Sequence, residues 1–173
     1  MTTTPVFGIT GWKNSGKTQL VTRLVAEFTA RGFKVSTVKH AHHNFDIDKP
    51  GADSYRHREA GASEVALVSG RRWALMHELR QEDEPSLADI LARLAPCDLV
   101  MIEGYKREDH PKIEARRLET VDRGALAPQD PNIMAIASDH ALPGETLPVF
   151  DLDDVPSMAD FIERHLDLKR VER

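Results

Sequence analysis

Glycine, lysine and threonine stand near the amino terminus at a spacing that suits phosphate chemistry. Residues 11–18 read G-x-x-x-x-G-K-T and directly follow the apolar run 6–9. The glycines allow backbone N–H groups to converge on phosphate oxygens, Lys17 can reach the terminal phosphates, and the Thr18 hydroxyl can ligate Mg²⁺. The pattern predicts a nucleoside triphosphate site made of Gly11, Trp12, Lys13, Asn14, Ser15, Gly16, Lys17 and Thr18.

A carboxylate is expected on the magnesium side of this site. Residues 99–102 are apolar and lead into Glu103 and Gly104. Ligands of open α/β sheets bind at the carboxyl ends of the strands, and a Mg²⁺ nucleotide site usually takes a carboxylate from a neighbouring strand end. We therefore expect Thr18 and Glu103 to form the metal side, and Asp98, at the other end of that strand, to be structural.

A histidine- and aspartate-rich segment follows the next expected strand. It contains His40, His42, His43, Asp48 and Asp53. Its place in the chain is typical of switch loops that approach the γ-phosphate, and a partner-facing loop fits equally. Two alternatives stay open: a transition-metal site, although the spacing matches no structural zinc pattern, and a plain surface loop.

Asp139 is the candidate for base recognition. It follows an apolar run at 133–137, and its carboxylate could accept hydrogen bonds from guanine N1–H and the N2 amino group. Adenine offers no such donor pair. The alternative is a turn or helix cap, because Ser138 and Asp139 are also good capping residues.

The elements that must position these residues alternate along the chain. Apolar and β-branched runs predict strands at 33–38, 64–69, 72–79, 98–102, 133–137 and 147–150. Helical spacing predicts helices at 19–28, 52–60, 87–94 and 155–168. This alternation predicts an α/β fold with a mostly parallel central sheet, covered by helices on both faces, of the P-loop NTPase type.

Two segments are less regular. Residues 64–79 are predicted to form a β-ribbon with Trp73 and Met76 on one side. Residues 107–132 show no clear pattern, although 112–117 is compatible with a strand.

Bulk composition narrows the class. The chain has 173 residues, a net charge of −5 and a single cysteine, Cys97. These values predict one domain over 1–173 with no general nucleic-acid surface, and a cysteine buried as a small apolar side chain. Without a signal-like leader or a long apolar run, we expect a cytoplasmic protein with no membrane role.

Taken together, these motifs resemble the MobB family, the molybdopterin-guanine dinucleotide biosynthesis adapter proteins. The resemblance extends over about residues 5–165 and is carried by the segments 11–18, 39–43, 48–54, 58–62, 72–76, 102–106 and 135–139. It implies a homodimeric GTP-binding protein with at most weak GTP hydrolysis, which assists the guanylyltransferase that attaches GMP to the molybdopterin cofactor.

By matching positions, the resemblance implies that residues 11–18 hold the GTP phosphates, that Glu103 lies beside Mg²⁺ and that Asp139 reads guanine. One position departs from many dimeric relatives in the wider superfamily. They carry a lysine directly after the first loop glycine, where this chain has Trp12 and places Lys13 one residue later. A small-molecule kinase and a metallochaperone GTPase are the alternative functions for the same loop.

Overall fold

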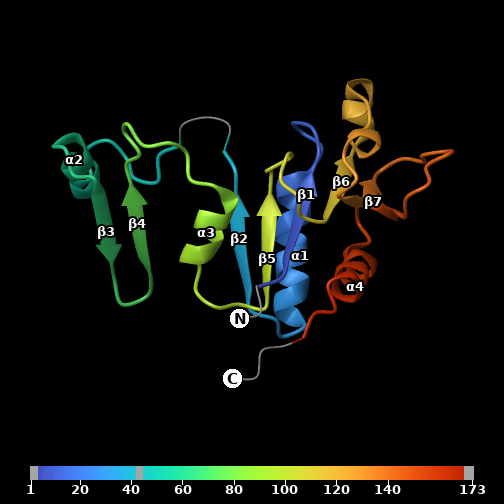
Figure 1. The fold of residues 1–173 in the computed structure, drawn as a ribbon, viewed down its shortest axis with the longest axis horizontal. Helices are drawn as coiled ribbons and strands as arrows, with labels where there is room; N and C mark the ends of the chain where they lie inside the picture. Colours follow the sequence, from blue (N-terminus) through green and yellow to red (C-terminus); the bar gives the residue numbers. More distant parts are fainter. Residues whose placement is uncertain (1–3, 42–44, 170–173) are drawn as a thin grey trace. The chain divides into compact units, whose positions relative to one another are not determined.

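The computed structural model describes residues 4–41 and 45–169 (Figure 1). The chain divides into two compact units, one formed by residues 1–40 and 90–173 and the other by residues 41–89. The expectation that residues 1–173 act as one domain stays a prediction. Among the described residues, no helix combines the length and apolar character that crossing a bilayer requires.

The larger unit is built on a six-stranded parallel sheet. Its strand order is β2-β5-β1-β6-β7-β8, and each neighbouring pair is parallel. The strands are β1 (Val6–Thr10), β2 (Val35–Lys39), β5 (Leu99–Glu103), β6 (Lys112–Arg116), β7 (Ile133–Ser138) and β8 (Val149–Asp151). The predicted parallel α/β sheet of the P-loop NTPase type is confirmed, and the strand expected near 112–117 is β6.

Two helices cover one face of this sheet. α1 (Lys17–Ala30) presents Leu20, Leu24 and Phe28 at helical spacing, and α4 (Val155–His165) packs beside it. Strand side chains of alternating position, such as those of Phe7 and Ile9, complete the apolar core. Helical periodicity of 3.6 residues and strand periodicity of 2 therefore meet in one buried layer.

The opposite face is covered differently. Here the buried side chains of β6 are Lys112 and Glu114, which contact the segment 104–132. That segment contains two 3₁₀ helices, η1 (Leu118–Arg123) and η2 (Ala127–Gln129). The helical cover of this face is thus partly short 3₁₀ turns. Such turns carry little amphipathic periodicity, so the sequence around 107–132 shows no clear pattern.

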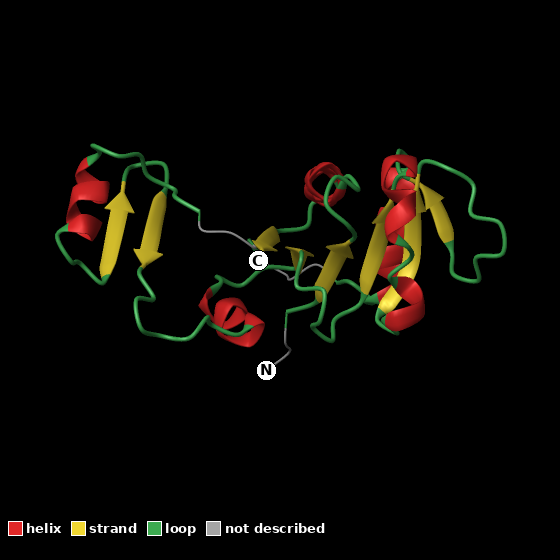
Figure 2. Cartoon of the chain, turned by 90° about the horizontal axis from the view of Figure 1, so that it is seen from above, coloured by secondary structure: helices red, strands yellow, loops and turns green. Residues whose placement is uncertain are grey.

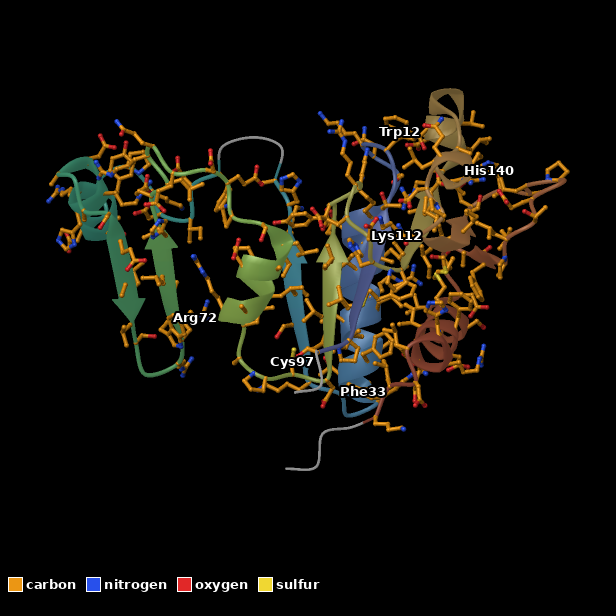
Figure 3. The ribbon with its side chains drawn as sticks, in the orientation of Figure 1. Trp12, Phe33, Arg72, Cys97, Lys112 and His140 are labelled. Atoms are coloured by element: carbon orange, nitrogen blue, oxygen red, sulfur yellow. The ribbon has the colours of Figure 1, made fainter. Side chains whose placement is uncertain are left out.

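The two ends of the strands lie at opposite ends of the larger unit. Trp12 and His140 lie at one end of the larger unit, and Phe33 and Cys97 lie at the opposite end (Figure 3). Cys97 is buried, as expected. Asp98 accepts a 2.6 Å hydrogen bond from the Lys34 backbone N–H, which confirms its structural role.

The smaller unit contains an antiparallel ribbon. β3 (Glu64–Val68) pairs with β4 (Trp73–His77), as predicted for residues 64–79, and α2 (Asp53–Glu59) contacts β3. The two strands are also visible in the view from above (Figure 2). One detail of the prediction was wrong: Trp73 is 72% exposed whereas Met76 is buried. Residues three apart in a strand point to opposite faces.

The helix after the ribbon is α3 (Leu87–Arg93). Its start is capped, because the Ser86 hydroxyl accepts the Asp89 backbone N–H at 3.2 Å while the Asp89 carboxylate accepts the Ser86 backbone N–H at 3.0 Å. These reciprocal bonds satisfy donors that the first turn of a helix leaves unpaired.

Candidate nucleotide site

The loop between β1 and α1 has a backbone that glycine makes possible. Gly11 and Gly16 have φ values of 144° and 88°, and Gly16 is the residue that precedes α1. A Cβ at position 11 would stand 2.5 Å from Ser15 Oγ and 2.6 Å from the Ala115 carbonyl oxygen. The chain therefore winds tightly at the carboxyl end of β1 and leads directly into the amino end of a helix, where partial positive charge favours anions.

Thr18 and Glu103 meet at the first turn of this helix. The Thr18 hydroxyl donates a 2.7 Å hydrogen bond to Glu103 Oε1, and the same oxygen lies 3.1 Å from Lys39 Nζ. Glu103 and Lys39 are the last residues of β5 and β2, which pair in parallel with these two residues opposite each other. The sheet register thus assembles a hydroxyl, a carboxylate and a cation at one point.

Lys17 is folded back on its own loop. Its ammonium donates a 2.6 Å hydrogen bond to the Trp12 carbonyl oxygen. Burial lowers the pKa of Lys17, the nearby charges of Lys106 and Lys39 lower it further, and Glu103 partly opposes them. A lysine surrounded by cations is electrostatically suited to a bound anion, because each negative charge relieves this repulsion.

The side chains present fit a phosphate chain and a divalent cation. Ser15 Oγ is buried with no hydrogen-bond partner, so the loop holds a polar atom that its own fold does not satisfy. Buried polar atoms normally have partners, and a bound phosphate or water would supply one here. On the metal side, Thr18 and Glu103 provide the oxygen ligands that Mg²⁺ prefers.

Trp12 connects the loop to the segment after β6. Its indole N–H donates to the Gly124 carbonyl oxygen at 2.9 Å, and the Lys106 ammonium lies 4.4 Å from the centre of the indole ring. A hollow of about 140 Å³ opens between Trp12, Arg117 and His140. Trp12 therefore forms one wall of the space beyond the phosphate loop.

Asp139 lies directly after β7, next to this hollow through His140. Its Oδ1 accepts the Leu118 backbone N–H at 2.9 Å and lies 2.9 Å from His140 Nδ1. Burial alone would raise the pKa of Asp139, but the bonds from His140 and Leu118 hold it below its usual value. The carboxylate is therefore ionised at neutral pH and already orders a turn. Base recognition by Asp139 stays a prediction, and the turn role expected as its alternative is present.

The histidine- and aspartate-rich segment does not form one cluster among the described residues. The His40 ring stacks on Tyr105 with centroids 4.5 Å apart, whereas His42 and His43 lie outside the described residues. In the smaller unit, Asp48 is bound to Arg58 at 2.6 Å with only 5% of its side chain exposed, and Asp53 is exposed. In the described parts of the chain, no group of three His, Cys, Asp or Glu residues is placed to hold a metal ion.

Two residues at the site were missed by sequence reasoning. Lys39, the counter-ion of Glu103, ends a short strand, and its place opposite Glu103 depends on a register that the sequence does not state. Lys106 follows the Glu103-Gly104 exit, and a left-handed Tyr105 at φ 47° turns the chain there. Lysines within three residues of a strand end near the loop would have been the available signal.

Comparison with known proteins identifies the family of this chain. A model of the family described as molybdopterin guanine dinucleotide synthesis protein B, or MobB, matches residues 6–139. The chain belongs to the MobB family. A relative from Haemophilus influenzae, named molybdopterin-guanine dinucleotide biosynthesis adapter protein, is 41% identical over 165 residues, covering 94% of this chain and 89% of the relative. A relative of the same name from Escherichia coli is 37% identical and covers 91% of each chain.

Solved MobB structures agree with the fold. The crystal structure of Bacillus subtilis MobB aligns with a TM-score of 0.73 at 25% identity and covers 94% of this chain and 98% of that one. A MobB homologue from Bacillus stearothermophilus aligns with a TM-score of 0.69 at 30% identity over 94% and 97%. The alignments cover both units, so the ribbon as well as the sheet is part of the fold shared with these MobB structures.

Proposed function

We propose that this chain is a GTP-binding adapter that assists guanylylation of the molybdenum cofactor in the biosynthesis of molybdopterin-guanine dinucleotide. The observation that carries the proposal is the pairing of a glycine-bounded phosphate loop with Thr18 and Glu103 at 2.7 Å. Relatives that cover nearly all of the chain bear the adapter name. The phosphate loop supports the nucleotide-binding part of the proposal, and membership of the family supports the pathway.

GTP is the proposed nucleotide and Mg²⁺ the proposed ion. Residues 11–18 would hold the phosphates, with Thr18 and Glu103 on the metal side and Asp139 beside the base. An ionised carboxylate next to a hollow favours guanine, since guanine presents N1–H and the N2 amino group as two adjacent donors, whereas adenine offers no such pair. Mg²⁺ when bound would screen the repulsion between phosphate oxygens. Lys17 and the backbone N–H groups of the loop would orient the triphosphate.

An adapter reads or presents a nucleotide and does little chemistry on it. Fast phosphoryl transfer needs a positioned water and often an arginine finger, which contributes about 10³–10⁵ in rate. We propose that intrinsic GTP hydrolysis is slow, that the working form is a homodimer in the cytoplasm, and that the partner is the molybdenum cofactor guanylyltransferase with its molybdopterin substrate.

Calorimetric titration tests the nucleotide assignment. GTP and ATP are titrated into the chain with Mg²⁺ and with a chelator. We expect tight binding only for GTP with Mg²⁺. Equal affinity for ATP would contradict the proposal that Asp139 recognises guanine. No binding of either nucleotide would contradict the proposed phosphate site.

A pull-down tests the adapter role. The guanylyltransferase is captured on this chain with and without GTP, and the complex is quantified by its stoichiometry. A GTP-dependent complex supports an adapter whose nucleotide sets a conformation. Capture in neither state contradicts the adapter role even if GTP binds.

A further inference from the structure

Arg117 lies directly against the phosphate loop. A Cβ built on Gly16 would be 2.9 Å from Arg117 Nε and 3.1 Å from its Nη2. Nη2 donates a 2.9 Å hydrogen bond to the Gln19 side chain in the first turn of α1. The guanidinium therefore covers the junction between the loop and the helix, the end at which a phosphate chain would receive backbone N–H groups.

The charge of Arg117 is not compensated within the described side chains. Its Nε is buried with no hydrogen-bond partner, and no described carboxylate pairs with it. Arg116 also has a buried Nε without a partner, but its charge is compensated, because its Nη atoms bind Glu114 at 2.7 Å and Glu145 at 2.8 Å. Burying a guanidinium donor without a partner costs free energy, so such a group is expected to meet an anion in the working state.

The position and the charge of Arg117 both indicate a phosphate group as this anion. Arg117 lines the hollow beside Trp12 and His140, and it also contacts Gly16. It thus lies between the phosphate loop and the space next to Asp139. Guanidinium groups bind phosphate oxygens through two parallel N–H bonds, a geometry that a lysine ammonium cannot supply.

We propose that Arg117 is a phosphate-binding residue that acts in cis on the nucleotide of its own chain, at the phosphates nearest the helix. This inference rests on the proposed nucleotide site and adds a residue outside residues 11–18. It also gives a reason for the departure at position 12: a cation reaches the loop from the segment after β6, within one chain.

The competing explanation is that Arg117 only ties β6 to α1 through Gln19. Two variants separate the explanations. Gln19→Ala removes the tie and keeps the guanidinium, whereas Arg117→Gln removes the charge. Arg164→Gln, on the exposed side of α4, is the matched control for loss of one arginine charge.

The experiment measures Kd for GTP and GDP with Mg²⁺ by calorimetry at several salt concentrations, with thermal unfolding of each variant recorded in parallel. We expect Arg117→Gln to raise both Kd values by about tenfold or more, because a charge-assisted hydrogen bond is lost. The salt dependence of binding should also become shallower, and Arg117→Lys should recover only part of the affinity. Gln19→Ala and Arg164→Gln should change Kd by less than about threefold.

The outcomes are distinct. If the unmodified chain binds GTP and Arg117→Gln binds it equally well, the proposal for Arg117 is overturned while the GTP assignment stands. If Gln19→Ala weakens binding as much as Arg117→Gln, with no change in salt dependence, the role is structural and the proposal also fails. If the unmodified chain binds no GTP, both proposals fall.

Discussion

The Thr18 hydroxyl donates to the Glu103 carboxylate across 2.7 Å, although 85 residues separate them in the sequence. Parallel pairing brings this about: β1 pairs with β5 so that Ile9 lies opposite Glu103, and the loop after β1 then delivers Thr18. A carboxylate held in this way is available to a cation. Lys39 Nζ at 3.1 Å is the cation next to it in this structure.

Replacing Glu103 tests the metal side. Glu103→Gln keeps an oxygen acceptor for Thr18 but removes the negative charge, so Mg²⁺ should no longer tighten GTP binding. We expect the ratio of Kd without and with Mg²⁺ to fall toward one, while Kd in a chelator stays equal or improves. Calorimetry measures both. Thr18→Ser, which keeps the hydroxyl, should preserve the Mg²⁺ effect, and a normal Mg²⁺ effect in Glu103→Gln would contradict the assignment.

Lys17 is expected to account for much of the GTP affinity. Lys17→Ala removes an ammonium that would bind terminal phosphates, and losing about two charge-assisted bonds corresponds to roughly a hundredfold rise in Kd. The fold should remain, because among the described residues the Lys17 side chain donates one hydrogen bond, to the Trp12 carbonyl oxygen. Titration calorimetry and circular dichroism check these outcomes. Lys34→Ala, at an exposed position just before β2, is the control; retained GTP affinity in Lys17→Ala would show that the phosphates lie elsewhere.

The sequence predicted the phosphate loop and Glu103 because their signals are local. The loop needs glycine at set positions, and Glu103 ends a continuous apolar run, so both can be recognised without knowing which strands pair. Asp98 was predicted as structural for the same reason, since it begins that run. The parallel fold followed from the alternation of elements.

Other site residues depend on long-range geometry. Arg117 contacts Gly16 because β6 lies beside β1, and the order of strands is not written in either segment. Asp48 was predicted as a loop residue facing a nucleotide or partner, but its side chain is buried against Arg58. A carboxylate and an arginine ten residues apart across a turn give no periodic signal, so this pairing could not be read from spacing.

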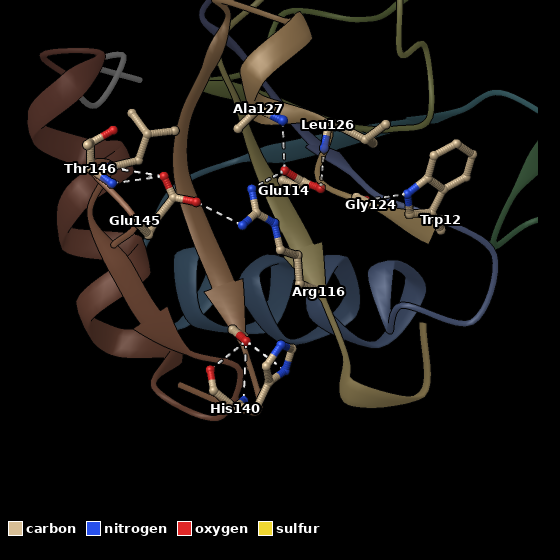
Figure 4. A network of polar contacts seen from close by, with 11 residues as sticks. Trp12, Glu114, Arg116, Gly124, Leu126, Ala127, His140, Glu145 and Thr146 are labelled. Carbon is tan, nitrogen blue, oxygen red and sulfur yellow. Dashed lines mark hydrogen bonds and ion pairs between the residues drawn. The ribbon is translucent and has the colours of Figure 1, made fainter. Parts of the chain in front are cut away.

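A buried ion network should stabilise the segment after β6. Glu114 is fully buried and accepts the Leu126 and Ala127 backbone N–H groups, while Arg116 joins it to Glu145 (Figure 4). Arg116→Met leaves two carboxylates without their cation, so the free energy of unfolding should fall by about 3–5 kcal/mol. Urea denaturation measures this.

The matched control is Arg23→Met. Arg23 pairs with Asp153 at 2.7 Å, and the two side chains are 44% and 88% exposed, so the expected loss is about 0–1 kcal/mol. Equal losses of unfolding free energy in the two variants would show that the buried Arg116 network stabilises the fold no more than an exposed ion pair does.

The same network predicts an acid-dependent term. Burial opposes ionisation of Glu145, yet hydrogen bonds from Arg116 and nearby N–H groups hold its pKa below 4.5. The folded state therefore binds this proton more weakly than the unfolded state. Its contribution to stability should be complete above pH 4.5 and decline as pH falls through the folded pKa. In Arg116→Met this decline should shrink, which urea unfolding at a series of pH values can detect.

His110 should make the fold sensitive to mild acid. Its ring is buried against Gly8 with neither nitrogen hydrogen-bonded, and burial, reinforced by the charge of Lys112, lowers its pKa from 6.5 to about 4. The unfolded chain then binds the proton more readily between these values, so stability falls as pH drops through the window. A shift of this size corresponds to about 3 kcal/mol.

The comparison is between His110→Asn and His57→Asn, which removes an exposed imidazole in α2. Carboxylates titrate in all three proteins, so the informative quantity is the difference in slope of unfolding free energy against pH between 6.5 and 4. We expect His110→Asn to be less stable at neutral pH, because it loses packing over Gly8, but flatter across the window. His57→Asn is the control for the loss of one imidazole, so only a flattening specific to His110→Asn supports the prediction. An unchanged slope in His110→Asn would contradict a lowered pKa of His110 in the folded state.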